Sequence, residues 1–300
     1  MSKRLFRRNF IKKSIALLSG IFVAGTGTKN LQAQNQRSKK SSKYDEPAND
    51  TIRTIKSLRT THGNFTDQDI PDSKLQIILD STVRAANSSN MQTYSIVVVK
   101  DRDKMKKLGG YKASVMIVYC VDYNRLKSSA KSLGHSYYPD TMTDFVTGSI
   151  NTGLAVQTAA IAARSLGLDY LITNGIHRGN MGRLWEILDL PKEHCFPLIA
   201  LYLGYPTQEP ANKKGRLKNT GIIYHEKYHT LTKAELDEIT SLYDDKNHHI
   251  ALNQDWVPKG HKHYLDWLFT AWARRPKPAD SETQIFKILK RSGFIELQKS

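Results

Sequence analysis

The sequence has little cysteine: Cys120 and Cys195 are the two thiols among its 300 residues. Two thiols cannot form the disulfide framework that stabilises small secreted scaffolds. Both lie inside or beside apolar runs, so we expect small buried side chains, and whether they pair with each other stays open. A chain of this length can bury an adequate core without such cross-links.

Acidic residues are absent from positions 1–44, a segment that holds eleven lysines and arginines. Because the whole chain has a formal charge of +17, the remaining residues carry only +6. That surplus is modest and is not clustered among aromatic residues. The charge therefore does not predict nucleic-acid binding.

A run long enough to cross a membrane is also missing near the start of the chain. The apolar stretch 14–27 is too short and too rich in glycine to span a bilayer comfortably. It follows a basic segment and precedes Leu31-Gln32-Ala33, which is the order of a signal peptide. Residues 6–12, with their paired arginines, resemble the twin-arginine export motif. We predict a twin-arginine signal peptide over 1–33 that meets the membrane transiently and delivers the protein to the periplasm; an uncleaved amphipathic anchor is the alternative.

The remainder of the chain divides by composition. Residues 34–50 are rich in serine, lysine and glutamine and predict a flexible basic linker. Residues 51–230 alternate between apolar β-branched runs and helical periodicity, which predicts an α+β domain with a mixed central sheet flanked by helices. Residues 231–300 predict a C-terminal helical extension. The expected strands are 94–100, 115–121, 170–173 and 196–203, and the expected helices are 51–60, 72–86, 148–166 and 181–188.

Two kinds of catalytic pattern are missing from the sequence. No Ser-His-Asp or paired-carboxylate constellation is evident, so we name no catalytic side chain. No Gly-x-Gly-x-x-Gly follows a strand, which argues against a separate nicotinamide-binding domain.

Three polar segments are candidates for binding a ligand. Arg59-Thr60-Thr61 offers a guanidinium and two hydroxyls, which suit a phosphate, although such a triplet also ends many helices. The amides of 87–92 can donate to and accept from the polar edge of a planar ring, although the segment also fits an ordinary turn. Lys214-Gly215-Arg216 follows a Gly-Tyr-Pro turn and is equally compatible with a solvated basic loop.

Taken in order along 51–228, these segments resemble the nitroreductase family of FMN enzymes. The resemblance also rests on an alanine-rich helix that ends in Leu166-Gly167-Leu168, on Leu190-Pro191, and on a strand that ends in Gly204-Tyr205-Pro206. It implies a homodimer with two FMN sites at the subunit interface. It further implies a ping-pong reaction in which reduced FMN passes electrons to a small acceptor, such as a nitroaromatic or a quinone.

The resemblance assigns a role to residues of each polar segment. It places Arg59 and Arg216 on the FMN phosphate, with Thr60 and Thr61 beside it and Lys214 assisting. It places Asn90 and Gln92 near the isoalloxazine ring, whose face meets the backbone of Thr173, Asn174 and Gly175.

One departure from the family pattern bears on redox chemistry. Gly63 stands where many members have a second basic residue, and positive charge near a flavin tunes its potential. The physiological donor and acceptor therefore stay open, and an exported enzyme lacks ready access to cytosolic NAD(P)H. Reductive dehalogenation and flavin fragmentation are alternative chemistries of the same fold.

A rival motif is His225-Glu226-x-x-His229, which matches the His-Glu-x-x-His pattern of zinc peptidases. In such enzymes the two histidines lie one helical turn apart and bind the metal. Here the preceding residues are β-like and no apolar helical face flanks the pair. We therefore predict no metal site.

Overall fold

The computed structural model describes residues 49–139, 141–273 and 283–295. The predicted signal peptide, 1–33, and nearly all of the predicted linker, 34–50, lie outside the described residues. Among the described residues, no helix has the length and apolar composition needed to cross a membrane.

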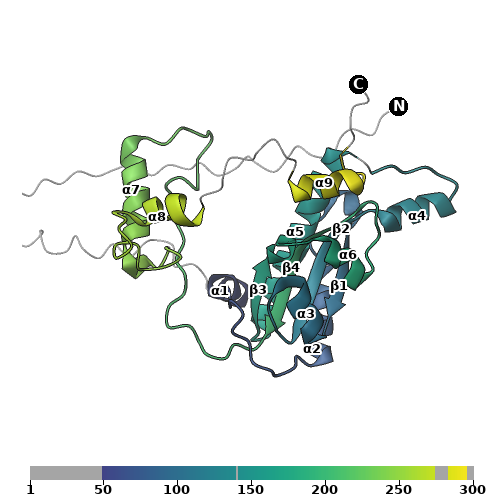
Figure 1. The fold of residues 1–300 in the computed structure, drawn as a ribbon, viewed down its shortest axis with the longest axis horizontal. Helices are drawn as coiled ribbons and strands as arrows, with labels where there is room; N and C mark the ends of the chain where they lie inside the picture. Colours follow the sequence, from purple (N-terminus) through teal and green to yellow (C-terminus); the bar gives the residue numbers. More distant parts are fainter. Residues whose placement is uncertain (1–48, 140, 274–282, 296–300) are drawn as a thin grey trace, which may run out of the picture. The chain divides into compact units, whose positions relative to one another are not determined.

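A four-stranded sheet forms the centre of the fold (Figure 1). Its strands are β1 (Tyr94–Val99), β2 (Val115–Asp122), β3 (Asp169–Thr173) and β4 (Cys195–Gly204), in the spatial order β1-β2-β4-β3. The three strand pairs are antiparallel. A parallel component is supplied by the isolated bridge between Thr60 and Tyr170. The α+β class predicted from the sequence is confirmed.

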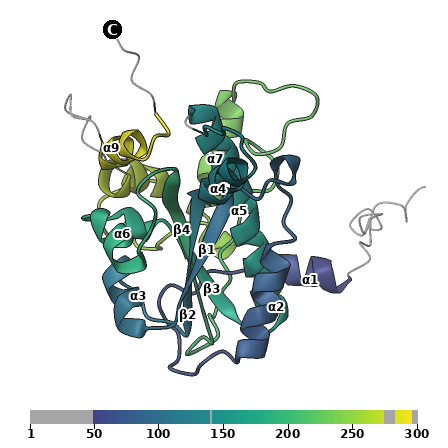
Figure 2. The same ribbon diagram turned by 90° about the vertical axis from the view of Figure 1, so that its right-hand side faces the viewer.

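Helices cover both faces of the sheet (Figure 2). The helices α2 (Asp72–Thr82) and α5 (Met142–Ser165) pack on one face. The helices α3 (Arg102–Gly109), α6 (Gly182–Leu188) and α9 (Gln284–Arg291) pack on the other. Two more helices are α1 (Asp50–Ser57), which precedes the loop that begins at Arg59, and α4 (Asn124–Ser132), which precedes α5.

Each face of the sheet has its own apolar core because successive side chains of a strand point to opposite faces. In β2, Ile117 and Tyr119 lie in the core beneath α2 and α5, whereas Met116, Val118 and Cys120 lie in the core beneath α3 and α6. All five side chains are fully buried. The alanines of α5 are buried in the first of these cores, between α2 and the sheet.

The segment that follows β4 has a small core of its own. It contains α7 (Lys233–Asp244), the 3-10 turn Lys246–His248, and α8 (Tyr264–Trp267), which continues into a π-helical turn, Leu268–Trp272. Ala251, Trp256, Tyr264 and Trp267 are buried together there. In contrast, Ile288, Leu289 and Phe294, in and just after α9, are buried in the sheet core, so the predicted extension 231–300 contributes to two different cores.

Candidate functional site

The loop that carries the first polar segment is attached to the edge of the sheet. The backbone N–H of Thr61 donates to Tyr170 O at 2.9 Å, and Thr60 forms the parallel bridge to the same residue. The loop is attached again further along, where Phe65 pairs with Pro206. These backbone contacts place Arg59 and Thr61 beside the first residue of β3.

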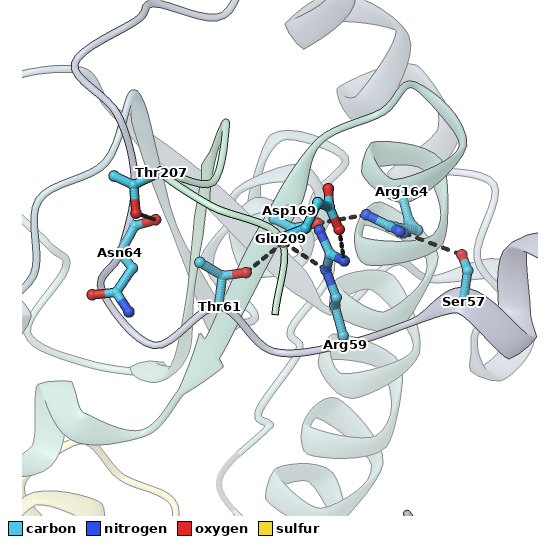
Figure 3. Close-up of polar contacts among 8 residues, drawn as sticks. All are labelled: Ser57, Arg59, Thr61, Asn64, Arg164, Asp169, Thr207 and Glu209. Carbon is cyan, nitrogen blue, oxygen red and sulfur yellow. Dashed lines mark hydrogen bonds and ion pairs between the residues drawn. The ribbon is translucent and has the colours of Figure 1, made fainter. Parts of the chain in front are cut away.

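A buried carboxylate organises this segment (Figure 3). Asp169 is 1% exposed, and its Oδ2 accepts from Arg59 Nε at 2.8 Å and from Thr61 Oγ1. Its Oδ1 accepts from Arg164 Nη1 at 2.5 Å, and Arg164 Nε donates to Ser57 Oγ at 3.1 Å. Two guanidiniums and a hydroxyl therefore satisfy one buried charge, as burial of a carboxylate requires.

Arg59 has a second acidic partner at the surface. Its Nη1 donates to the Glu209 carboxylate, which belongs to the loop after β4 and is 75% exposed. This bond raises the pKa of Arg59 above its ordinary value and lowers the pKa of Glu209. The remaining nitrogen of the guanidinium, Nη2, is buried and has no hydrogen-bond partner among the described residues.

The second polar segment is a strained turn. Ser89, Asn90 and Gln92 all have a positive φ, at 50°, 54° and 49°. Residues other than glycine seldom adopt this backbone conformation. Strain of this kind persists only where surrounding contacts impose it, and it gathers at ligand sites. Asn87 Oδ1 accepts from Gln92 N at 2.9 Å.

Two side chains from helices hold the same turn in place. The buried amide of Asn151, in α5, accepts from Ser88 N at 3.0 Å and donates to Thr93 Oγ1 at 2.8 Å. Arg125, in α4, donates to the carbonyls of Met91 and Gln92 at 2.7 and 2.6 Å. Asn151 and Arg125 therefore both support the turn, and the contribution of Arg125 was not predicted.

The predicted segment Thr173-Asn174-Gly175 lies at the end of β3, whose last residue is Thr173. Gly175 is buried, and its backbone N–H donates to Thr173 Oγ1 at 2.9 Å. A Cβ at position 175 would lie 3.0 Å from that hydroxyl, so a larger residue would displace it. Asn174 is exposed between the two.

The basic segment after β4 is built differently. Lys214 Nζ donates to Ala251 O at 2.6 Å, so this side chain attaches the loop to the C-terminal segment. Its ammonium is therefore not directed at the phosphate position, where it was predicted to assist. A Cβ at Gly215 would lie 2.0 Å from His248 O, so only glycine fits this contact. The exposed Arg216 donates only to the carbonyls of Lys214 and Gly215 in the described residues. Its charge nevertheless reaches Tyr170, whose pKa is raised by burial and lowered in part by Arg164 and Arg216.

An open cleft of about 590 Å³ adjoins Gly175. Tyr111 lines this cleft and also contacts the first loop, because its ring lies 5.5 Å from that of His62. A Cβ at Gly63, where φ is 81°, would lie 2.9 Å from Tyr111 Cδ1. A basic residue at position 63 would therefore clash with Tyr111, which explains the departure noted in the sequence. The cleft itself was not predicted, because its lining comes from two stretches, 106–111 and 175–183, that lie far apart in the sequence.

The rival zinc motif is not helical. Glu226 has a φ of 63° and the interval around it is turn and bend, so His225 and His229 do not share a helix face. His229 Nε2 instead lies 2.9 Å from Glu235 Oε1. No group of three potential metal ligands occurs within the ranges that the structure describes. The zinc-peptidase hypothesis is wrong for the described chain.

Comparisons with known proteins agree with this geometry. The family model described as "Nitroreductase family" matches residues 55–205. The chain is 31% identical to an FMN reductase [NAD(P)H] of Bacillus subtilis over 66% of this chain and 81% of that one. It is also 31% identical to an NADPH-flavin oxidoreductase of Vibrio harveyi, over 65% and 80% of the two chains. The solved structure of B. megaterium NfrA2 superposes with a TM-score of 0.69 at 26% identity, covering 82% of this chain and 98% of that one.

The sheet, the helices on both its faces and the polar loops at its edge define an α+β protein of nitroreductase fold. The family match extends over half of the chain and includes Arg59, the strained turn and Gly175. The chain belongs to the nitroreductase family.

Proposed function

We propose that this FMN-dependent oxidoreductase passes electrons from a reduced donor to a small organic acceptor. The relatives named above are FMN and flavin reductases that use NAD(P)H, which supports the cofactor and the reaction class. The observation that carries the proposal is the Nη2 of Arg59, a buried donor for which the described part of the chain offers no acceptor. Such a donor costs free energy until an anion supplies the missing bond, and a phosphate oxygen would do so.

The residues present fit FMN at both of its ends. Arg59 would hold the phosphate and Arg216 would complete the charge from the loop after β4, whereas the predicted Thr61 donates its hydroxyl proton to Asp169 and would act by positioning Arg59 through that shared carboxylate. Phosphate would take the place of the exposed Glu209 carboxylate on Arg59. The strained turn and the backbone of Gly175 would position the ring, because both are rigidly held.

When bound, FMN supplies the two-electron chemistry, and the protein supplies position, charge and exclusion of water. Asn151 and Arg125 keep the turn 88–92 in one conformation, so its amides meet the ring without further ordering. Gly175 leaves room for a planar ligand where a side chain would intrude. Donor and acceptor would use the same face in succession, which gives ping-pong kinetics.

The test separates the two half-reactions. The FMN-loaded chain is mixed without oxygen with NADPH, and the bleaching of the flavin absorbance is followed. A nitroaromatic or a quinone is then added, and the return of the absorbance is followed. Bleaching and return in separate steps would support the proposal; bound flavin that neither donor nor acceptor affects would contradict it.

We also propose that the active form is a homodimer. Met142, Val146, Ile150 and Leu154 recur every four residues on α5 and are 46%, 50%, 59% and 43% exposed. Residues four apart share one helix face, and a contiguous exposed apolar face is typical of an interface. Ile150→Glu should convert the dimer to a monomer in analytical ultracentrifugation. Ser165→Glu, at the end of the same helix, should not; a wild-type monomer would contradict the proposal.

Export by the twin-arginine route is proposed from residues 6–12 alone. Fractionation of cells that express the full chain tests it, with Arg7→Lys and Arg8→Lys together as the variant. The variant should stay in the cytosol while the wild type reaches the periplasm. In the periplasm NAD(P)H would not be the physiological donor. Wild-type protein found only in the cytosol would contradict both export and this conclusion about the donor.

A further inference from the structure

The cleft beside Gly175 carries a strong charge asymmetry. Its lining includes four cationic side chains, Lys106, Lys107, Arg178 and Arg183, and no carboxylate. Within the part of the chain that the structure describes, none of the four forms an ion pair within 4.0 Å. Cations concentrated in a concave site raise the local concentration of anions.

Arg183 is held in place without being neutralised. Its Nη2 donates to Leu108 O at 2.8 Å and to Ile176 O at 3.1 Å, and its Nε donates to Lys107 O at 3.0 Å. These acceptors are neutral carbonyls, so the guanidinium keeps its full charge. Two of these carbonyls, those of Lys107 and Leu108, lie in the last turn of α3. The positive charge of Arg183 therefore offsets the partial negative charge of that helix end, which faces the cleft.

Glycine leaves the floor of the cleft open. Gly110 has a φ of 85°, and a Cβ built there would meet no heavy atom within 4 Å. Gly179 has a φ of 67° on the facing loop. Both backbones adopt a conformation that other residues rarely take, and neither projects a side chain toward a ligand.

We propose that this cleft receives the anionic group of the electron acceptor, so that the enzyme prefers small aromatic acceptors bearing a carboxylate or sulfonate. The inference rests on the proposed function, because it is Gly175 that places the cleft next to the flavin ring. The volume of about 590 Å³ suits one substituted ring.

The reaction with such an acceptor balances with the reduced flavin alone. The nitro group of 4-nitrobenzoate takes two electrons and two protons, one N–O bond breaks, and 4-nitrosobenzoate and water leave. The flavin is oxidised in the same step. The cleft cations hold the carboxylate and take no part in the electron transfer.

The test compares 4-nitrobenzoate with 4-nitrobenzamide, which share the ring, the nitro group and nearly the same size but differ in charge. The FMN-loaded enzyme is reduced photochemically, and its reoxidation by each compound is followed by stopped flow. The ratio of the two rates is then measured for the wild type and for the double variant Lys106→Gln, Lys107→Gln. The difference in intrinsic reducibility of the two compounds cancels between the two proteins.

We expect the double variant to lower the rate ratio by about five- to thirtyfold, since two solvent-facing charges are lost. The wild-type preference should also shrink as salt is added. The matched control is Lys104→Gln with Lys131→Gln, which removes two exposed lysines outside the cleft and should leave the ratio unchanged. An unchanged ratio in the cleft variant, or an equal slowing with both compounds, would overturn the proposal.

A second measurement does not require bound flavin. Binding of 4-nitrobenzoate to the flavin-free chain, measured by ligand NMR relaxation, should weaken in the cleft variant but not in the control. If the variant alters the NADPH-to-NADH rate ratio and not the acceptor ratio, the cations serve the donor and the proposal is wrong. Bound flavin that neither compound reoxidises in the wild type would instead contradict the proposed function, while the NMR result would still decide the cleft.

Discussion

The two arginines assigned to the same phosphate lie in regions of opposite character. Arg59 is 12% exposed, is anchored to the buried Asp169 and belongs to the matched family segment. Arg216 is exposed and follows that segment in the chain, and within the described ranges its side chain hydrogen-bonds only to carbonyls of its own loop. Arg59 is thus held by a buried carboxylate, whereas Arg216 is held by exposed backbone carbonyls of its own loop.

This contrast indicates that the two arginines would contribute to FMN binding in different ways. A preorganised group loses little entropy when a ligand binds, whereas an exposed arginine must be ordered at that moment. Substitution near Asp169 should therefore damage folding first and binding as a consequence. Substitution of Arg216 should weaken binding and leave folding intact.

The largest effect is expected for Asp169→Asn. It leaves the guanidiniums of Arg59 and Arg164 without their shared counter-charge, and breaking a buried pair in this way costs about 3–5 kcal/mol. Urea denaturation followed by circular dichroism measures the loss. Asp237→Asn, which breaks an exposed pair with Lys233, is the control and should change stability by less than about 0.5 kcal/mol. Equal losses of stability in the two variants would contradict the view that Asp169 anchors the fold around Arg59.

Arg216→Ala should come next, with an effect on FMN alone. Loss of a charge-assisted hydrogen bond to phosphate predicts a dissociation constant about 10- to 100-fold higher. Fluorescence quenching of free FMN by the protein measures it, and the urea midpoint should not move. Lys218→Ala removes a nearby exposed cation and should leave the affinity as it is. If Arg216→Ala retains FMN as the wild type does, its assignment to the phosphate fails.

Glu209→Gln should act in the opposite direction and more weakly. Its carboxylate occupies Arg59 in the absence of phosphate, so removing the charge removes a competitor. We expect FMN to bind up to about fivefold more tightly, because an exposed ion pair contributes little. The same quenching titration measures it. Weaker binding would mean that Glu209 helps to hold the cofactor and does not compete with it.

The smallest effect concerns pH and the segment after β4. Glu235 closes a capping box with Thr232 at the start of α7, and the backbone N–H of Thr232, together with His229, lowers its pKa from 4.5 to about 2. Because the folded pKa is depressed, this stabilisation is complete above pH 4.5 and disappears as the pH falls through about 2. An NMR titration of the Glu235 carboxyl should show that midpoint, and Thr232→Ala, which removes the hydroxyl that also donates to this carboxylate but keeps the backbone N–H, should raise it part of the way toward 4.5. A wild-type midpoint near the ordinary value would exclude the capping box in solution.

The strands were predictable from sequence to within one or two residues, because buried β-branched runs leave a clear signal. The start of α5 was not: it begins at Met142, six residues before the predicted position 148. Its first turns are capped by Thr141 and expose apolar side chains, so the periodicity that marks burial on one face is absent. The helix α3 was missed because it is strongly charged and buries only Met105 and Leu108.

Candidate site residues could be nominated from the sequence where a single segment supplies the chemistry. Arg59, Asn90 and Gly175 were nominated in this way, and their roles stay predictions. Asp169 and Glu209 were not, because their roles depend on contacts with Arg59 across 110 and 150 positions of the chain. The reason for Gly63 likewise became clear only from the ring of Tyr111, which a neighbouring loop brings against it.

The central claim is that the Asp169-anchored loop, the strained turn and Arg216 together hold FMN. The visible absorption spectrum of the purified full chain, followed by chromatography of the released cofactor, tests it most directly. The account predicts a yellow protein that carries, or takes up on addition, close to one FMN per chain. A folded protein that is colourless and refuses added FMN would contradict it.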